Sequence, residues 1–332
     1  MSAATPPGRT LAMGENEATS AGSDVVEAPF GKAMVTLGTK RPDVVGLTAD
    51  LGKYTDIAPF RDAYPERFFN VGMAEQNLVA VAAGLSRTSL VPFATTYGVF
   101  ASRRAYDFIA IALAHSRLNV KIIAGMPGLT TGYGGTHQAT EDLALMRMIP
   151  DLVVIDPCDA VEIQAATRAI ADHDGPVYMR LLRGAVPVSL APDYRFKIGK
   201  THLLRQGCDI GIISTGLMTT NALKAAEVLE AQGIGLGVLH VPTIKPFDAA
   251  AVVAFAAGFP QLVTAENHVI VGGLGSLVTE ALFDARVQVP VTRIGLPDRF
   301  IPCGSVPTLQ ARYGISVTAM VESIARLVVQ RP

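Results

Sequence analysis

The sequence predicts an α/β protein of two domains, each a mostly parallel twisted sheet flanked by helices. Short β-branched runs alternate with Ala-rich stretches from Phe30 onward, a pattern typical of parallel strands joined by crossover helices. The 332 residues are enough for two domains of ordinary size. The alternation lapses between Gly184 and Arg195 and starts again at Asp209, so we expect the domain boundary there.

The first domain is expected over residues 29–188. Ala, Leu, Ile or Val recur at helical spacing in each of its predicted helices. The predicted strands are 43–48, 90–94, 120–124, 152–155 and 177–181, and the predicted helices are 75–86, 99–114, 140–148 and 159–171.

A linker is expected over residues 189–204 and a second α/β domain over 205–332. Its predicted strands are 210–214, 236–241, 261–265 and 291–294, with helices at 219–231 and 275–285. Residues 1–28 mix Ala, Thr, Ser, Gly, Pro and Glu without an apolar core. They are predicted to form a flexible tail rather than a signal peptide.

Composition argues against several classes of protein. The 28 basic and 29 acidic residues form no long runs of one sign, so a nucleic-acid partner is not expected. No segment is long and apolar enough to predict a membrane span. Cys158, Cys208 and Cys303 lie far apart, which fits neither a disulfide framework nor a zinc knuckle and favours the cytoplasm.

Two glycine-rich stretches, residues 125–135 and 272–276, invite a nucleotide-binding interpretation. Neither contains a Walker loop, and neither has the spacing and downstream acid of a dinucleotide fingerprint. Taken alone, both stretches predict tight turns.

Glu75 lies at the start of a long apolar helix, directly after a short predicted strand. Acidic residues are common there because they interact favourably with the helix dipole. Its neighbours support a functional interpretation as well: an aromatic segment follows at residues 92–100, and Thr136-His-Gln lies further along the chain.

Several ordered motifs together resemble the C-terminal portion of the transketolase-like thiamine-diphosphate enzymes, from Phe30 to the end. Val71-Gly-Met-Ala-Glu-Gln-Asn is similar to the segment whose glutamate contacts the cofactor's aminopyrimidine ring. Similarity continues in Thr136-His-Gln with Glu141-Asp142, in Met148-Ile-Pro, in Pro242-Thr-Ile-Lys-Pro-Phe-Asp, and in Glu266-Asn-His followed by Gly272-Gly-Leu-Gly-Ser.

The resemblance implies roles for individual residues. Catalytic roles fall on Glu75 and His137, cofactor contacts on Asp50, Glu75, Tyr97 and Phe100, and substrate contacts on His137, Arg183 and Tyr133. Other interpretations stay open: Asp50 as a solvated loop residue, Tyr97 as a core aromatic, and Arg180 in place of Arg183 as the phosphate ligand. Tyr133 departs from the family, because transketolases commonly have an aspartate there that recognises a donor hydroxyl.

The resemblance also implies a partner. Family members hold the diphosphate through Mg²⁺ bound by a Gly-Asp-Gly segment and a later Asn, and this sequence contains no Gly-Asp-Gly. An N-terminal subunit is therefore expected to supply the Mg²⁺ ligands in an α2β2 complex that transfers a two-carbon ketol unit between sugar phosphates. The alternatives are the β subunit of a 2-oxoacid dehydrogenase, a deoxyxylulose-phosphate-synthase-like enzyme and a non-catalytic regulatory subunit.

Overall fold

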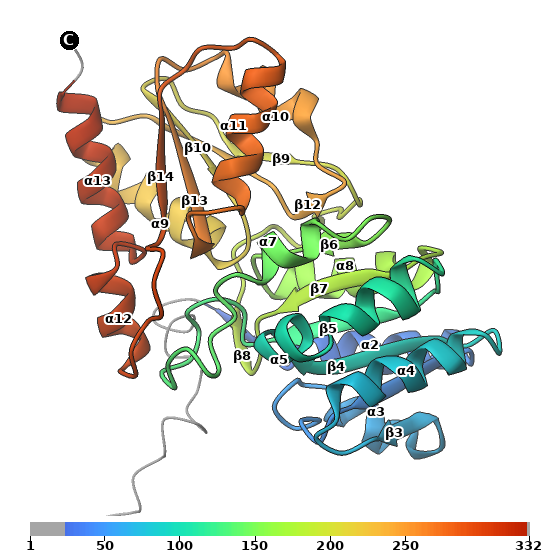
Figure 1. Ribbon diagram of the computed structural model, residues 1–332. Helices are drawn as coiled ribbons and strands as arrows, with labels where there is room; N and C mark the ends of the chain where they lie inside the picture. The colour runs from blue at the N-terminus through green and yellow to red at the C-terminus, as the bar shows by residue number, and fades with distance from the viewer. Residues whose placement is uncertain (1–23, 331–332) are drawn as a thin grey trace, which may run out of the picture.

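The computed structural model describes residues 24–330 and has the predicted fold class, two mostly parallel sheets flanked by helices (Figure 1). A seven-stranded sheet of order β12-β6-β7-β5-β4-β2-β3 forms the core of the first domain. Its first-domain strands, all parallel, are β2 (Val44–Thr48), β3 (Phe68–Asn70), β4 (Val91–Tyr97), β5 (Lys121–Gly125), β6 (Val153–Ile155) and β7 (Val177–Leu181).

Two hydrophobic clusters cover the two faces of this sheet. One contains residues of α2 (Pro29–Lys40), α3 (Ala58–Ala63) and α8 (Ala160–Asp172). The other contains residues of α4 (Glu75–Ser86), α5 (Gly98–Arg104), the π-helix Ile109–Ala114 and α7 (Asp142–Arg147). The second cluster continues into the second domain, so the two domains share buried apolar surface.

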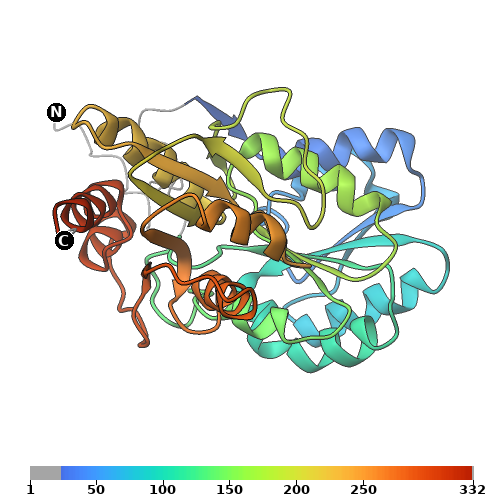
Figure 2. The same ribbon diagram turned by 90° about the horizontal axis from the view of Figure 1, so that it is seen from above.

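The second domain contains a five-stranded sheet of order β14-β13-β10-β11-β9. Its strands are β9 (His202–Arg205), which is antiparallel, and the parallel β10 (Ile210–Ser214), β11 (Leu236–His240), β13 (Leu262–Val269) and β14 (Val291–Leu296). The helices are α9 (Leu217–Glu230), α10 (Ala249–Ala256), α11 (Leu274–Asp284), α12 (Val306–Arg312) and α13 (Val317–Val329). Seen from above, the helices of this domain lie on both sides of its sheet (Figure 2).

One strand crosses between the domains. The short strand β12 (Thr243–Lys245) follows β11 in the chain but pairs antiparallel with β6, at the edge of the first sheet. The Lys245 ammonium donates to the carbonyl oxygens of Arg147, 3.1 Å away, and Ile149. These carbonyls lie at the end of α7, where helix carbonyls lack intrahelical partners.

Local structure differs from the prediction in two places. Strand β1 (Val25–Glu27) pairs antiparallel with β8 (Ala185–Pro187), although the sequence placed it in a flexible tail; residues 1–23 lie outside the described part. The single helix predicted over 99–114 is divided into α5, the short α6 (Tyr106–Phe108) and the π-helix; the backbone leaves helical geometry at Ala105 (φ −108°, ψ 11°), between α5 and α6. Within residues 24–330, no helix has both the length and the apolar character needed to cross a membrane.

Candidate active site

A cavity of about 460 Å³ opens beyond the carboxyl ends of the parallel strands β2, β3, β4 and β5. Ligand sites in open α/β sheets gather at this edge. Five of the predicted residues line the cavity together: Glu75, Tyr97, Phe100, Tyr133 and His137. The remaining lining residues are Ala49, Leu51, Tyr54, Met73, Arg104 and Thr136.

Glu75 is the first residue of α4, and its side chain is 4% exposed. Strand β3 ends five residues earlier, so the turn between them directs the helix N-terminus at the cavity. The Arg104 guanidinium donates from Nη1 to Glu75 Oε1 over 2.9 Å. The site therefore contains one buried carboxylate, paired with a cation whose side chain is half exposed.

Aromatic rings form one wall of the cavity. The ring centroids of Tyr97 and Phe100 are 5.6 Å apart, and those of Phe100 and His137 are 5.5 Å apart. Tyr133 lies 5.2 Å from His137, measured between ring centroids. Burial raises the pKa of the Tyr97 phenol to about 12, so this ring stays neutral. The wall offers apolar faces against which a planar ring can pack.

The loop that carries Tyr133 and His137 is held by the second domain. The Gly304 N–H donates to the Gly132 carbonyl over 3.0 Å, and a Cβ atom added to Gly132 would lie 2.2 Å from the Gly304 oxygen. The Leu129 N–H donates to the Asn267 side-chain oxygen over 2.8 Å. Glycine in this stretch thus permits close contact between two backbones, a use beyond the tight turns predicted from sequence.

Two residues of this loop that carry polar groups line the cavity. His137 is half-buried, and its Nδ1 atom lies 2.9 Å from the Thr136 hydroxyl. Burial, and then the nearby Arg104 charge, lower the pKa of the His137 imidazole, which favours its neutral form. The Tyr133 hydroxyl is buried and has no hydrogen-bond partner among the described residues. A buried hydroxyl without a partner is costly.

Asp50 and Arg183 do not line the cavity. Asp50 is exposed in left-handed conformation (φ 59°), and its carboxylate accepts a hydrogen bond from the Asn70 side chain over 3.0 Å. Arg183 is partly buried and interacts electrostatically with Tyr97 and Asp56. Arg183 therefore lies close enough to the aromatic wall to influence it, without contributing to its surface.

Arg180, the alternative to Arg183, is the centre of a buried network. Its side chain is 1% exposed, and its guanidinium pairs with Asp142 through two nitrogens and with Asp156 at 3.3 Å. Asp142 also accepts a hydrogen bond from the Tyr178 hydroxyl over 2.7 Å. With its nitrogens committed to these acids and to backbone carbonyls, Arg180 has no free face for a substrate.

The main contributor that the sequence analysis missed is Arg104. Its guanidinium carbon lies 4.0 Å from the centroid of the Phe100 ring, in addition to the contact with Glu75. The only sequence signal was the pair Arg103-Arg104 inside the predicted helix 99–114, and two adjacent cations on a helix do not by themselves indicate a ligand site.

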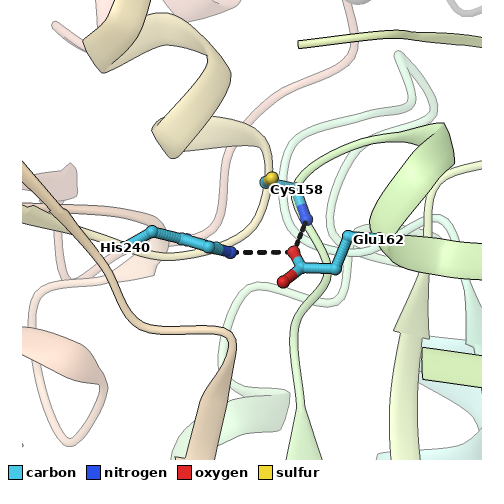
Figure 3. A group of neighbouring side chains, drawn as sticks. All are labelled: Cys158, Glu162 and His240. Atoms are coloured by element: carbon cyan, nitrogen blue, oxygen red, sulfur yellow. Dashed lines mark hydrogen bonds and ion pairs between the residues drawn. The ribbon is translucent and has the colours of Figure 1, made fainter. Parts of the chain in front are cut away.

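A second polar cluster joins the domains and could be mistaken for a metal site (Figure 3). Glu162 Oε2 accepts from the Cys158 N–H and lies 2.8 Å from His240 Nε2, while the Tyr194 hydroxyl donates to Oε1. Burial raises the pKa of the Cys158 thiol well above its usual value, whereas zinc binds the thiolate. The carboxylate is already hydrogen-bonded, so we interpret the cluster as an interdomain contact.

Comparison with known proteins agrees with this architecture. The model of the transketolase pyrimidine-binding domain matches residues 26–189, and that of the transketolase C-terminal domain matches residues 199–320. A transketolase family protein of Sinorhizobium fredii is 56% identical over 90% of this chain and 87% of its own length. A 6-deoxy-6-sulfo-D-fructose transketolase subunit of a Clostridium species is 42% identical over 84% and 87%, respectively.

Two further relatives show which part of a transketolase-family enzyme this chain matches. A solved split-gene transketolase, described as an inactive β4 tetramer, superposes with a TM-score of 0.83 at 41% identity, covering 92% of this chain and 98% of that one. A 1-deoxy-D-xylulose-5-phosphate synthase of Syntrophotalea carbinolica is 36% identical over 94% of this chain, but the match spans 49% of that enzyme.

The two matched domains define a protein of the thiamine-diphosphate-dependent class, and the chain belongs to the transketolase family. Within that family it corresponds to the C-terminal section of a split transketolase. The cavity fits the aminopyrimidine end of this cofactor, because it combines a buried carboxylate with aromatic faces.

Proposed function

We propose that this chain is the C-terminal subunit of a two-chain, thiamine-diphosphate-dependent transketolase. It would transfer a two-carbon ketol unit from a ketose phosphate to an aldose phosphate. The observation that carries the proposal is the convergence of Glu75, Phe100 and His137 on one cavity in a chain that lacks Gly-Asp-Gly. The cavity would bind the pyrimidine end of the cofactor, and another subunit would bind the diphosphate end.

Bound thiamine diphosphate supplies an electron sink for the carbanion formed when a ketose is cleaved. Glu75 would hold a proton in a hydrogen bond with the aminopyrimidine ring. Phe100, and Tyr97 beside it, would orient that ring by packing against its face. The Glu75 side chain is only 4% exposed, and fixed groups act more strongly where little water reaches them than in bulk solvent.

On the substrate side, the His137 imidazole and the Tyr133 hydroxyl would hydrogen-bond sugar hydroxyls. Both come from the loop held by the second domain, so their positions are fixed before substrate arrives. Arg183 is the candidate for the acceptor's phosphate, for which a guanidinium is well shaped. Asp50 remains a candidate cofactor contact from the loop after β2.

An N-terminal subunit would bind the diphosphate and Mg²⁺, and two copies of each subunit would form an α2β2 complex. The split-gene relative is described as inactive in its β4 form, which supports the need for a second chain in that protein. Apolar side chains exposed near the cavity, such as Met73 at 80%, are suited to burial against a partner.

The test is reconstitution. This chain alone should show no ketol transfer, and mixing it with an N-terminal transketolase subunit from the same genome should restore turnover with thiamine diphosphate and Mg²⁺. Light scattering should then show both subunits in one complex. Activity of the isolated chain, with no other subunit detectable by mass spectrometry, would contradict the proposal.

A second candidate is the deoxyxylulose-phosphate-synthase reaction, which the 36% identity to that synthase favours. The two reactions differ in donor: the synthase decarboxylates pyruvate, whereas a transketolase cleaves a ketose. Supplying each donor separately to the reconstituted complex, with glyceraldehyde 3-phosphate as acceptor, distinguishes them. Release of CO₂ from pyruvate would favour the synthase reaction.

Replacing Tyr133 with Phe removes the hydroxyl that lacks a partner and keeps the ring beside His137. If the hydroxyl binds a sugar, kcat/KM should fall about twofold to tenfold, the worth of one neutral hydrogen bond. Stability should stay equal or rise slightly, because a buried unsatisfied group is removed. Thermal unfolding and steady-state kinetics on the same preparations check both expectations; unchanged kcat/KM would exclude the hydroxyl from substrate binding.

A further inference from the structure

The Arg104 side chain occupies the part of the cavity that the proposed function assigns to the cofactor's ring. Its planar guanidinium lies over the face of Phe100, 4.0 Å from the ring centroid, and donates to Glu75 Oε1 over 2.9 Å. An aminopyrimidine ring in this cavity would use the same two contacts, the face of Phe100 and the carboxyl of Glu75. Both groups are flat, and both would meet the carboxyl through a nitrogen atom at their edge.

We propose that Arg104 acts as an internal substitute for the aminopyrimidine ring, closing the cofactor site of the unassembled subunit and leaving it when the ring binds. This inference rests on the proposed function. The guanidinium and the ring compete, because one face of Phe100 and one Oε1 atom cannot serve both groups together. Closure also gives the buried Glu75 carboxylate a counter-ion in the absence of cofactor, when it would otherwise be left uncompensated.

The exposures of the two partners indicate which one moves. The Glu75 side chain is 4% exposed and fixed at the first residue of α4, whereas the Arg104 side chain is 50% exposed. Arg104 is also the last residue of α5, directly before the break at Ala105. Arg104 can therefore turn into solvent without moving the backbone, whereas Glu75 could leave only if the first turn of α4 moved.

The neighbouring Arg103 shows that this arrangement is specific to Arg104. Arg103 pairs with Glu141 and donates to the Gly135 carbonyl over 2.6 Å, and it does not line the cavity. The two consecutive arginines therefore make different contacts and have different roles. Arg103 supports the loop that carries His137, and Arg104 covers the carboxylate.

Binding of the ring alone tests the proposal without activity. The probe is 4-amino-5-hydroxymethyl-2-methylpyrimidine, titrated by ligand-detected NMR into the full isolated chain, wild type or Arg104→Met. Loss of one half-exposed ion pair and one cation–π contact should tighten binding about threefold to thirtyfold. Arg87→Met, which removes an exposed arginine at the far end of α4, should bind as wild type does. Equal or weaker binding by Arg104→Met would overturn the proposal.

A rescue experiment addresses the same point independently. In Arg104→Ala, millimolar methylguanidinium should weaken binding of the pyrimidine again, whereas tetramethylammonium at equal concentration should not. If both ions weakened pyrimidine binding equally, the proposed competition between a guanidinium and the ring would be contradicted. Failure of the proposed function looks different: the pyrimidine would then bind no variant, or would bind Glu75→Ala as well as wild type. Loss of binding in Glu75→Ala with no gain in Arg104→Met would reject only the role of Arg104.

Discussion

Replacing Glu75 with Gln is expected to reduce turnover of the reconstituted complex about a hundredfold to ten-thousandfold, the usual contribution of a positioned proton-transfer group. Glutamine keeps the size of the side chain and can still donate a hydrogen bond, but it cannot exchange a proton with the pyrimidine ring. The loss should therefore lie in cofactor activation. Turnover and deuterium exchange at the thiazolium carbon, measured on one preparation, should fall together.

The same variant should fold and assemble normally. If Glu75 were merely an acid in the first turn of α4, its replacement would cost about 0.3 to 1 kcal/mol of stability and leave the rate unchanged. Glu66→Gln is the matched control, because Glu66 is an exposed acid in a first helical turn outside the cavity. Near-normal turnover and exchange in Glu75→Gln would mean that another group activates the cofactor.

Replacing Asp142 with Asn should destabilise the chain by about 3 to 5 kcal/mol, because it leaves the Arg180 guanidinium buried without its closest counter-ion. Asp156, the second acid beside Arg180, compensates only in part, because it contacts the guanidinium through a single nitrogen at 3.3 Å. Urea denaturation followed by circular dichroism measures the change. Asp151→Asn breaks the exposed pair with Arg117 and should cost less than about 1 kcal/mol.

The contribution of Asp142 to the free energy of unfolding should decrease as the pH falls. Burial alone would raise its pKa, but the Arg180 charge outweighs burial and holds the pKa below the usual 3.8. Stability from this carboxylate is therefore complete above about pH 5 and is lost as the pH falls through the lower folded-state pKa. The difference between wild type and Asp142→Asn should narrow in acid; a constant difference down to pH 3 would argue against an ionised Asp142.

The fold class and the principal members of the candidate site could be predicted from the sequence because both depend on local pattern. The alternation of strands and helices predicted the two sheets. Short motifs indicated Glu75, Phe100 and His137, which line one cavity in the structure. The division of helix 99–114 was missed because Ala101, Ala105, Ile109 and Leu113 follow one another at a spacing of four residues across the break.

Other features depend on contacts between distant residues, which a single sequence does not reveal. From the sequence, Arg180 was an alternative to Arg183 as a phosphate ligand. In the structure, its guanidinium is paired with Asp142 and Asp156. The contact of Gly132 with Gly304 joins positions 172 apart in the chain, and the residue type alone predicted only a turn. The position of Arg104 over Phe100 likewise depends on where α5 ends.

Strand β12 limits how this protein can be divided into fragments. A chain cut in the predicted linker would contain all the motifs of the first domain but would lose the strand that pairs with β6. The backbone N–H and C=O groups along that side of β6 would then be open to other molecules, and such an edge promotes aggregation. Fragments and chimaeras of this chain should therefore keep residues 243–245 with the first domain, or exchange both domains as one unit.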